Sequence, residues 1–423
     1  MKDNIKKLIY KYRELVPKKI FKRDLKISKL IFDKSNVIVG PRRAGKTYFL
    51  YSLSKNKKNP IIINFEDNLL TDIKPKELNK ILDYSKELFS KKSLSFFLDE
   101  IQNVDSWENF IVSLLNEHYP VYITGSNSKL LSKEIATSLR GKSLTYLILP
   151  LSFKEYLRFN KVELKKNFEY TDQVFKVKKH FENYFKYGGF PEVVLSDSLV
   201  LKNKLINNYF DSVLYKDLVE RLELKNIRLV EITIKYLLSL FANTFSITAY
   251  ENYLKSNKIP YSLEDIYRIL KSLQDVFLIS YVKNYSKSFK KSEISRSKVY
   301  IFDNGYIHFL TNENKDYGRI LENLVFIELF RREDNIENKN IYYYKNNYEC
   351  DFLVLKKDKP DKAIQVCYDL NYKNKKREIK GLVKTCKKFN LKTGLILTFD
   401  QEDEFVEDKI EIKVKPVWKW MLT

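Results

Sequence analysis

The sequence of 423 residues predicts an α/β protein whose first third forms a parallel β-sheet. Short apolar runs that are unbroken by charge alternate there with helical patterns, as expected for strands buried on both faces of such a sheet. A glycine-rich phosphate-binding motif follows the first run, and two adjacent carboxylates end the third. The runs, each about the length of one strand, are residues 36–40, 60–67, 93–100, 120–126 and 143–150.

The composition favours a polyanionic partner. Lysine and arginine number 77 against 54 aspartate and glutamate, which gives a net charge of +23 and attracts nucleic acid or another polyanion. A general bias toward lysine along the whole chain is the alternative explanation of this charge. The hydrophobic share of 44% is sufficient for several cores and excludes a wholly disordered chain.

The cysteines, histidines and N-terminal residues limit the metal chemistry and the location. Three cysteines without a Cys-x-x-Cys pair and three widely separated histidines argue against a disulfide framework and against zinc or histidine-rich sites. Residues 1–34 place charges between their apolar positions every few residues, which is typical of an amphipathic helix rather than a signal peptide or membrane span. We therefore expect a cytoplasmic protein without a membrane partner.

The order of the predicted elements divides the chain into four segments. Residues 1–150 contain the N-terminal helix and the parallel sheet, and residues 151–226 are expected to form a helical lid or connector. Residues 227–305 show three helices followed by an extended hairpin, which is the order of a winged helix-turn-helix. Residues 306–423 begin with a helix and continue with three strands, a basic helix and further strands, which predicts a mixed α/β domain.

The strongest motif lies between the first strand and the following helix. It reads Gly40, Pro41, Arg42, Arg43, Ala44, Gly45, Lys46 and Thr47, and it matches G-x-x-x-x-G-K-[ST] in full. Gly40 and Gly45 permit turns that direct backbone N–H groups at a phosphate, while the helix N-terminus adds partial positive charge. Lys46 is expected to span the β- and γ-phosphates, and Thr47 to offer its hydroxyl to Mg²⁺. The motif predicts the loop of a P-loop NTPase, with ATP or ADP and Mg²⁺ as ligands.

Two acids and a later amide complete the predicted site. Asp99 and Glu100 end the third apolar run, where Asp99 is expected to order the Mg²⁺ shell and Glu100 to polarise the attacking water. The next run ends in residues 124–127, and Asn127 is expected to sense the γ-phosphate or to orient the water. An ordinary turn at the end of a strand is the alternative for Asn127.

Three arginines are candidates for neutralising negative charge. Arg140 is expected to approach the transition state from the same chain or from a neighbouring subunit, and the second case would require a homo-oligomer. A solvated arginine at a helix end is the alternative. Arg42 and Arg43 lie within the phosphate loop and either add charge near the phosphates or pair with local acids.

Several sequence elements occur together in a characteristic order. They read GPRRAGKT, FFLDEIQNVDSWENF, ITGSNSKLL, SLRGK, LPLSFKEYL and YGGFPEVV between residues 40 and 194. In this order they resemble archaeal and bacterial AAA-type ATPases that carry a C-terminal domain of unknown function of the DUF4143 type. The resemblance covers the chain from about residue 21. It implies an AAA+-like ATPase domain, a winged-helix segment and a C-terminal region similar to restriction endonucleases, but it supplies no substrate.

The C-terminal segment carries polar residues in the order of a PD-(D/E)xK nuclease. Glu322 lies in a helix, Asp351 at a strand start beside Glu349, and Gln365 in the next strand, where acids would hold Mg²⁺. The expected Glu-x-Lys reads Gln365-Val366-Cys367, and a cysteine cannot replace the charge of lysine. Candidates for a displaced cation are Lys373, Lys376 and Lys380. The sequence favours an inactive nuclease-like domain; an active Mg²⁺-dependent nuclease and a pair of ordinary surface acids are the alternatives.

Two lysine-rich segments favour DNA as the polyanion. Residues 281–300 contain six basic residues and one acid, and residues 371–392 contain nine and one. Lysine contacts to phosphates give salt-dependent affinity with little sequence information, whereas an ordinary solvated face is the alternative. The sequence thus predicts a Mg²⁺-dependent ATPase that drives or switches a winged-helix and nuclease-like arm on DNA. An ATP-dependent switch for a protein partner and an active nuclease are the rival hypotheses.

Overall fold

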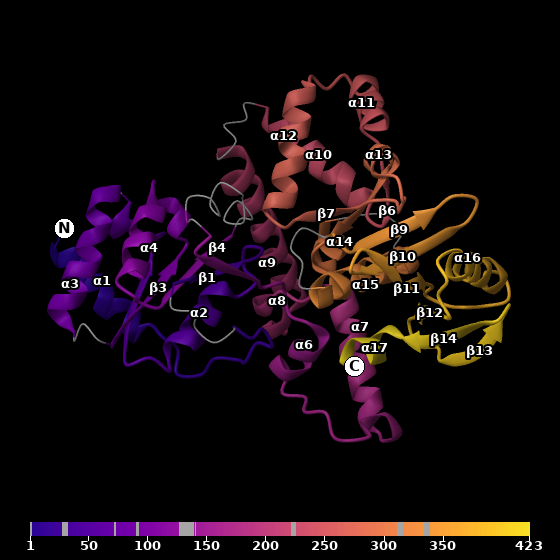
Figure 1. The fold of residues 1–423 in the computed structure, drawn as a ribbon, viewed down its shortest axis with the longest axis horizontal. Helices are drawn as coiled ribbons and strands as arrows, with labels where there is room; N and C mark the ends of the chain where they lie inside the picture. Colours follow the sequence, from indigo (N-terminus) through magenta and orange to yellow (C-terminus); the bar gives the residue numbers. More distant parts are fainter. Residues whose placement is uncertain are drawn as a thin grey trace. The chain divides into compact units, whose positions relative to one another are not determined.

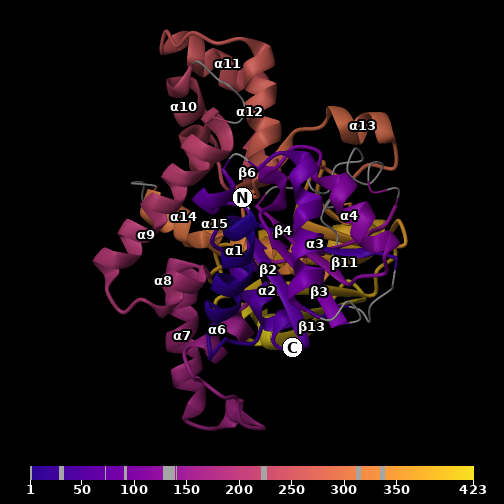
Figure 2. The same ribbon diagram turned by 90° about the vertical axis from the view of Figure 1, so that its left-hand side faces the viewer.

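The structure is a computed structural model of the chain. It describes residues 2–27, 33–71, 73–89, 93–126, 139, 141–220, 226–310, 316–333 and 339–423. The chain divides into two compact units, of which the first comprises residues 1–149 with 275–277 and the second residues 150–274 and 278–423. Figure 1 and Figure 2 show the helices and strands of each unit from two directions.

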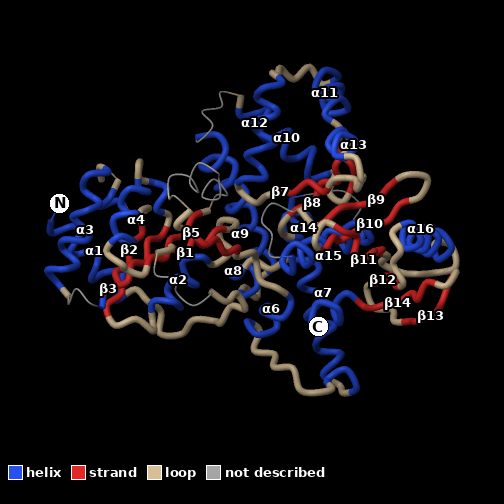
Figure 3. Tube along the Cα trace, viewed as in Figure 1, coloured by secondary structure: helices blue, strands red, loops and turns tan. Residues whose placement is uncertain are grey.

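A parallel sheet forms the centre of the first unit (Figure 3). Its strands are β1 (Ser35–Val39), β2 (Asn59–Asn64), β3 (Leu94–Asp99), β4 (Val121–Gly125) and β5 (Ser143–Leu147). Their order is β2-β3-β4-β1-β5, and every neighbouring pair runs parallel. The strands β1, β3 and β4 are buried along their whole length, which explains their uncharged sequences. The parallel sheet expected from the apolar runs is confirmed.

The helices of the first unit pack around this sheet. They are α1 (Lys2–Glu14), α2 (Lys46–Ser54), α3 (Leu78–Leu88) and α4 (Trp107–Asn116), with single 3₁₀ turns at Asn68–Leu70, Pro75–Glu77 and Ile101–Asn103. The N-terminal helix α1 contacts β2 and α3. Its buried side chains, Ile5, Leu8, Ile9 and Tyr12, recur at helical spacing, so one apolar face of the basic N-terminus is covered.

The second unit begins with a run of helices. They are α6 (Phe153–Phe159), α7 (Gln173–Tyr187), α8 (Pro191–Leu195) and α9 (Leu199–Ser212), with a 3₁₀ turn at Phe168–Tyr170 and a π-helical segment at Val213–Glu220. A capping box starts α6, because the Ser152 hydroxyl accepts the Glu155 N–H and the Glu155 carboxylate accepts the Ser152 N–H. Among the helices that the structure describes, none is long and apolar enough to cross a membrane.

A buried aspartate fixes the turn between α7 and α8. The two oxygens of the Asp303 carboxylate accept the backbone N–H groups of Gly189 at 2.7 Å and of Gly305 at 2.8 Å. Gly188 has a φ of +76°, and a β-carbon on it would lie 1.8 Å from Oδ1 of Asp303. The glycine at position 188 is therefore required by the close approach of this carboxylate as well as by its own backbone conformation.

Replacing Gly188 by alanine is expected to destabilise the second unit strongly. Strain at positive φ and overlap with Asp303 together should cost roughly 2–5 kcal/mol. Gly141 is the matched control, because its φ is +70° but, among the described residues other than its chain neighbours, no atom lies within 4 Å of where its β-carbon would stand. Thermal unfolding should show a clearly larger loss for Gly188→Ala than for Gly141→Ala. Equal losses would mean that the contact with Asp303 does not matter.

A small antiparallel sheet with helices follows in the second unit. The elements are α10 (Ile227–Ser239), β6 (Asn243–Phe245), α11 (Ile247–Ser256), α12 (Leu263–Asp275), β7 (Ile279–Val282), α13 (Phe289–Ile294) and β8 (Ser297–Ile301). The strand order is β6-β8-β7. The connection between β7 and β8 contains the short helix α13, where the sequence predicted only an extended hairpin.

A mixed six-stranded sheet forms the C-terminal part of the second unit. Its elements are α14 (Asn304–Leu310), α15 (Tyr317–Glu333), β9 (Ile341–Lys345), β10 (Glu349–Lys356), β11 (Lys359–Val366), α16 (Lys375–Lys388), β12 (Thr393–Thr398), β13 (Asp403–Glu407), β14 (Ile410–Pro416) and α17 (Val417–Leu422). The order is β13-β14-β12-β11-β10-β9, parallel only between β11, β12 and β14. The mixed α/β fold expected of the C-terminal segment is confirmed.

Hydrogen bonds join the small sheet to the six-stranded sheet. Just beyond β7, the Tyr285 N–H donates to the Tyr343 carbonyl at 2.8 Å, and the Tyr343 N–H donates to the Lys283 carbonyl at 3.1 Å. The Arg319 guanidinium of α15 donates to the carbonyls of Ser239 and Phe241. These bonds explain why one compact unit contains both sheets. The segments 151–226, 227–305 and 306–423 remain our subdivision of that unit.

Candidate functional site

The phosphate loop connects β1 to α2 through turns of positive φ. Gly40, Arg43 and Gly45 have φ values of +151°, +66° and +95°. Turns of this kind direct successive N–H groups toward an anion, and α2 begins directly behind them at Lys46. A β-carbon on Gly40 would lie 1.9 Å from the carbonyl oxygen of Ile148, so the first glycine of the motif is also required by packing.

Lys46 lies buried within this loop. Its ammonium group donates to the carbonyl oxygens of Gly40 and Pro41, both at 3.0 Å, and lies 3.8 Å from Oε1 of Glu100. Its exposed fraction is only 5%. The loop thus positions a cation between its own backbone and the acid pair, as the motif predicts.

Asp99 connects the ends of three elements of the first unit. The Thr47 hydroxyl of α2 donates to Oδ2 of Asp99 at 2.8 Å, and the Thr124 hydroxyl of β4 donates to Oδ1. The three side chains meet because the carboxyl ends of parallel strands share one edge of the sheet. Thr124 is a contact that sequence reasoning missed, although it lies in the segment that was expected near the site.

Glu100 has a backbone conformation that is unusual for its residue type. Its φ is +53°, in the left-handed region, and such strain in a non-glycine residue is characteristic of functional sites. The Glu100 N–H donates to the Thr124 hydroxyl at 3.1 Å. Its carboxylate accepts hydrogen bonds from Nε2 of Gln102 at 2.5 Å and from the Ser126 N–H at 3.2 Å. These contacts hold the carboxylate near Lys46.

The electrostatics of Asp99 fit a cation site. Burial and, next, the charge of Glu100 raise the pKa of Asp99 to about 6, against the opposing effect of hydrogen bonds from Thr124 and Thr47. A divalent cation would favour the ionised form of this carboxylate. Mg²⁺ in NTPases commonly takes one carboxylate and one hydroxyl, with phosphates and water completing its shell. Thr47 and Asp99 therefore fit Mg²⁺.

Two arginines stabilise the loop, Arg23 from outside it and Arg42 from within it. The guanidinium group of Arg23 donates to the Ala44 carbonyl at 2.7 Å and to the Leu149 carbonyl at 2.6 Å. Arg42 pairs with Glu66 at 3.1 Å, the local pairing that the sequence left open. Arg23 was not predicted, since nothing in the basic N-terminal segment distinguishes it from its neighbours.

Two predicted residues cannot be placed. Asn127 and Arg140 lie outside the residues that the structure describes, so their roles stay predictions. The remaining loop residues are placed: Ala44 is fully buried, and its N–H donates to the Pro41 carbonyl at 3.2 Å.

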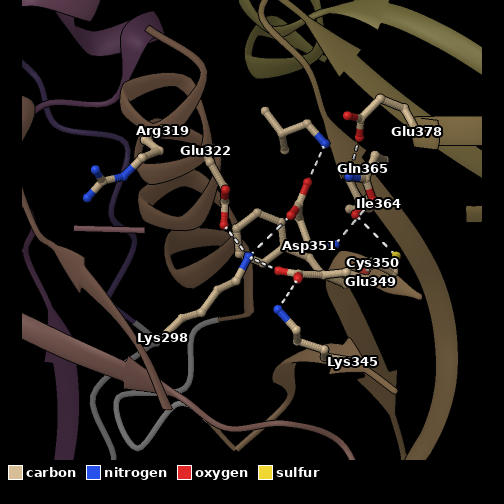
Figure 4. A network of polar contacts seen from close by, with 12 residues as sticks. Lys298, Arg319, Glu322, Lys345, Glu349, Cys350, Asp351, Ile364, Gln365 and Glu378 are labelled. Atoms are coloured by element: carbon tan, nitrogen blue, oxygen red, sulfur yellow. Dashed lines mark hydrogen bonds and ion pairs between the residues drawn. The ribbon is translucent and has the colours of Figure 1, made fainter. Parts of the chain in front are cut away.

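The C-terminal candidates form a second cluster (Figure 4). Glu322 projects from α15, Asp351 lies near the start of β10, and Gln365 near the end of β11, all of them buried. The cluster also contains Lys298 of β8, which the sequence suggested only as one of the six basic residues of the expected wing, residues 281–300. The lysines named as displaced cations, Lys373, Lys376 and Lys380, are instead exposed.

The arrangement of the first unit defines the class of protein. A loop that holds a buried lysine follows β1, and the acid pair lies at the end of β3, at the same edge of a parallel sheet. Such a strand, loop and helix with a distant acid pair are the features of P-loop NTPases. Residues 33–157 match the family profile of an AAA domain, residues 178–317 a domain of unknown function (DUF8612), and residues 317–420 a domain of unknown function (DUF4143).

Relatives extend this match over nearly the whole chain. The uncharacterized protein MJ1544 of Methanocaldococcus jannaschii is 43% identical over 414 residues, which cover 96% of this chain and 92% of that protein. An uncharacterized protein of Haemophilus influenzae is 31% identical over 335 residues, or 77% and 80% of the two chains. The chain belongs to this family of archaeal and bacterial proteins, which join an AAA domain to a DUF4143 domain.

The likeness to a solved structure is distant. The Thermotoga maritima RuvB Holliday junction branch migration motor covers 74% of this chain and 94% of its own, at 13% identity and a TM-score of 0.29.

Proposed function

We propose that this protein is a Mg²⁺-dependent ATPase whose nucleotide state controls a DNA-binding second unit. The observation that carries the ATPase is the meeting of Lys46, Thr47, Asp99 and Glu100 at one edge of the parallel sheet. In P-loop NTPases a lysine, a hydroxyl and an acid pair of this kind bind and hydrolyse a nucleoside triphosphate.

Each residue has a distinct role in this proposal. Lys46 binds the β- and γ-phosphates, and Thr47 with Asp99 holds Mg²⁺, which neutralises charge on the phosphate oxygens. Glu100 accepts a proton from the attacking water, and its hydrogen bonds from Gln102 and Ser126 fix the direction of its carboxylate. Because Glu100 already contacts Lys46 at 3.8 Å, binding of the phosphates would free this carboxylate from its cation.

The proposed DNA surface lies on the second unit. The order helix, strand, helix, helix, strand, strand over residues 227–301 supports a winged helix-turn-helix, with α13 in the wing. The exposed face of α12 carries Glu264, Arg268 and Lys271 and so has little net charge. The charge is concentrated in the wing instead, where the exposed basic residues are Lys287, Lys290, Lys291 and Arg296.

The wing lies next to the basic helix α16. The Tyr285 ring, at the base of the wing, meets the Phe389 ring, which directly follows α16, at 5.3 Å between centroids. Along α16 the lysines 376, 380, 384 and 388 recur every four residues and are all exposed. Two basic segments that are about 90 residues apart in sequence are thus in contact near the base of the wing and the end of α16. This proximity favours a long polyanion such as duplex DNA, bound through its phosphates.

The experiment that tests the proposal measures ATP turnover by the purified protein with Mg²⁺ or with EDTA, and with or without duplex DNA at low and high salt. Turnover that requires Mg²⁺ and is stimulated by DNA at low salt only would support both parts. Absence of turnover would refute the ATPase. ATP turnover that is unchanged by DNA would restrict the proposal to an ATP-dependent switch for a protein partner.

Neutralising three lysines of α16 is expected to weaken DNA binding and its dependence on salt. In the triple variant Lys376→Gln, Lys380→Gln, Lys384→Gln, the slope of log K against log salt should fall by up to about 3, roughly one unit for each lost phosphate contact. The matched control, Lys161→Gln, Lys165→Gln, Lys166→Gln, removes the same charge from exposed positions elsewhere. Fluorescence anisotropy with a labelled duplex measures both. Equal effects of the two triple variants would mean that the overall charge of the protein, and not the position of these lysines on α16, determines DNA binding.

A further inference from the structure

A buried lysine lies inside the C-terminal carboxylate cluster (Figure 4). Nζ of Lys298 lies 2.9 Å from Glu322, 3.0 Å from Glu349 and 3.2 Å from Asp351. Its side chain is only 5% exposed. The lysine comes from the small sheet, whereas the three carboxylates come from α15 and β10. The ammonium group therefore stands where the nucleases that this domain resembles would bind Mg²⁺.

The other groups of the cluster do not fit a divalent cation. Oε1 of Gln365 accepts the Asp351 N–H at 3.3 Å, and its Nε2 donates to Glu378 at 2.7 Å. Oδ2 of Asp351 accepts the Val366 N–H at 2.9 Å, while its Oδ1 contacts Lys298. The oxygens that a metal would need are thus engaged by protein donors. Across the described ranges of the chain, no group of three or more His, Cys, Asp or Glu is arranged to hold a metal.

The position of the expected nuclease lysine carries no charge. Burial raises the pKa of the Cys367 thiol to about 11, so that it stays neutral near physiological pH. Its Sγ donates to the Asp369 carbonyl at 3.2 Å. The charge that a lysine would supply at position 367 comes instead from Lys298, which approaches the carboxylates from another sheet.

We propose that Lys298 is the permanent cation of this cluster and takes the place of the metal, so that the C-terminal domain holds DNA without cleaving it. This inference deepens the proposed action on DNA. Its test measures neither ATP turnover nor DNA affinity. The inference about Lys298 can therefore fail while the proposed ATPase and DNA surface hold, and either of those can fail while the inference holds.

The charges in the cluster support a permanent cation. Burial alone would lower the pKa of Lys298, but its neighbours, led by Glu322, hold that pKa well above its ordinary value. The Tyr300 hydroxyl also donates to Glu322 at 2.6 Å. Buried charges persist when they are paired and hydrogen-bonded, and both conditions hold here.

The decisive experiment compares wild type, Lys298→Met and Lys298→Met/Asp351→Asn in thermal unfolding, without nucleotide, with and without millimolar MnCl₂. Removing one partner of a buried ion pair leaves the other charges unpaired, so Lys298→Met should lower the unfolding temperature by more than about 5 °C. Mn²⁺ should restore part of this loss in Lys298→Met only. Wild type and the double variant should not respond to Mn²⁺.

Lys345→Met is the matched control. Lys345 contacts Glu349 at 2.7 Å but is 54% exposed, so its loss should shift the unfolding temperature by less than about 2 °C and create no response to Mn²⁺. No response of Lys298→Met to Mn²⁺ would overturn the inference that Lys298 excludes the metal. If Lys298→Met does not fold, the wild type is compared with Asp351→Asn instead. Mn²⁺ binding or Mg²⁺-dependent plasmid cleavage by the wild type that Asp351→Asn abolishes would overturn the inference.

Discussion

Replacing Lys46 by alanine is expected to lower ATP turnover by about a hundredfold to a thousandfold, the usual effect of removing one preorganised donor to developing negative charge. The ammonium group is buried, fixed by the carbonyls of Gly40 and Pro41 and close to Glu100. Alanine removes the cationic side chain that the motif directs at the β- and γ-phosphates. Nucleotide affinity should fall together with turnover, which titration with a fluorescent ATP analogue measures.

The control for this variant lies on the same helix. Lys55 follows the last turn of α2 and donates to the Lys18 carbonyl at 2.7 Å, at the end of the helix away from the phosphate loop. Lys55→Ala should therefore keep both affinity and turnover. Full turnover by Lys46→Ala would contradict the assignment of the phosphate loop as the ATP site.

The phosphate site is predictable from sequence because its chemistry is local. Residues 40–47 are contiguous, and their glycines are needed by the loop itself, at positive φ. Asp99 and Glu100 end an uncharged run, and a run of that kind marks a buried strand of a parallel sheet. Once both strands are assigned to one sheet, the shared edge brings the two motifs together.

The remaining contacts of the two sites depend on which strands and segments lie side by side, and this cannot be derived from a single sequence. Thr124 reaches Asp99 because β4 lies beside β3, and Arg23 reaches the loop from an extended segment without a motif. Lys298 is the clearest case. In sequence it is one lysine among six basic residues of the expected wing, yet its position on β8 directs it into the carboxylates of another sheet. Lys298 differs from the other basic residues of the expected wing because it is buried, and burial is determined by tertiary packing.

Replacing Glu100 by glutamine is expected to separate ATP binding from ATP hydrolysis. Glutamine has the same size and keeps an oxygen for the Ser126 N–H, so the loop and Asp99 should stay in place. An amide cannot accept the proton of the attacking water, and loss of a general base typically costs about a hundredfold to ten-thousandfold in rate. Affinity for ATP should remain, or rise, because a negative charge near the phosphates is removed.

The two variants therefore make opposite predictions about binding. Lys46→Ala should lose affinity and turnover together, whereas Glu100→Gln should lose turnover alone, and equilibrium binding beside steady-state turnover distinguishes them. Glu117→Gln is the control for a lost acid outside the pair, since Glu117 at the end of α4 contacts Lys86 at 2.5 Å and is not buried. If Glu100→Gln hydrolyses ATP at the wild-type rate, the left-handed conformation of Glu100 serves the fold alone, and the water must be activated by another group.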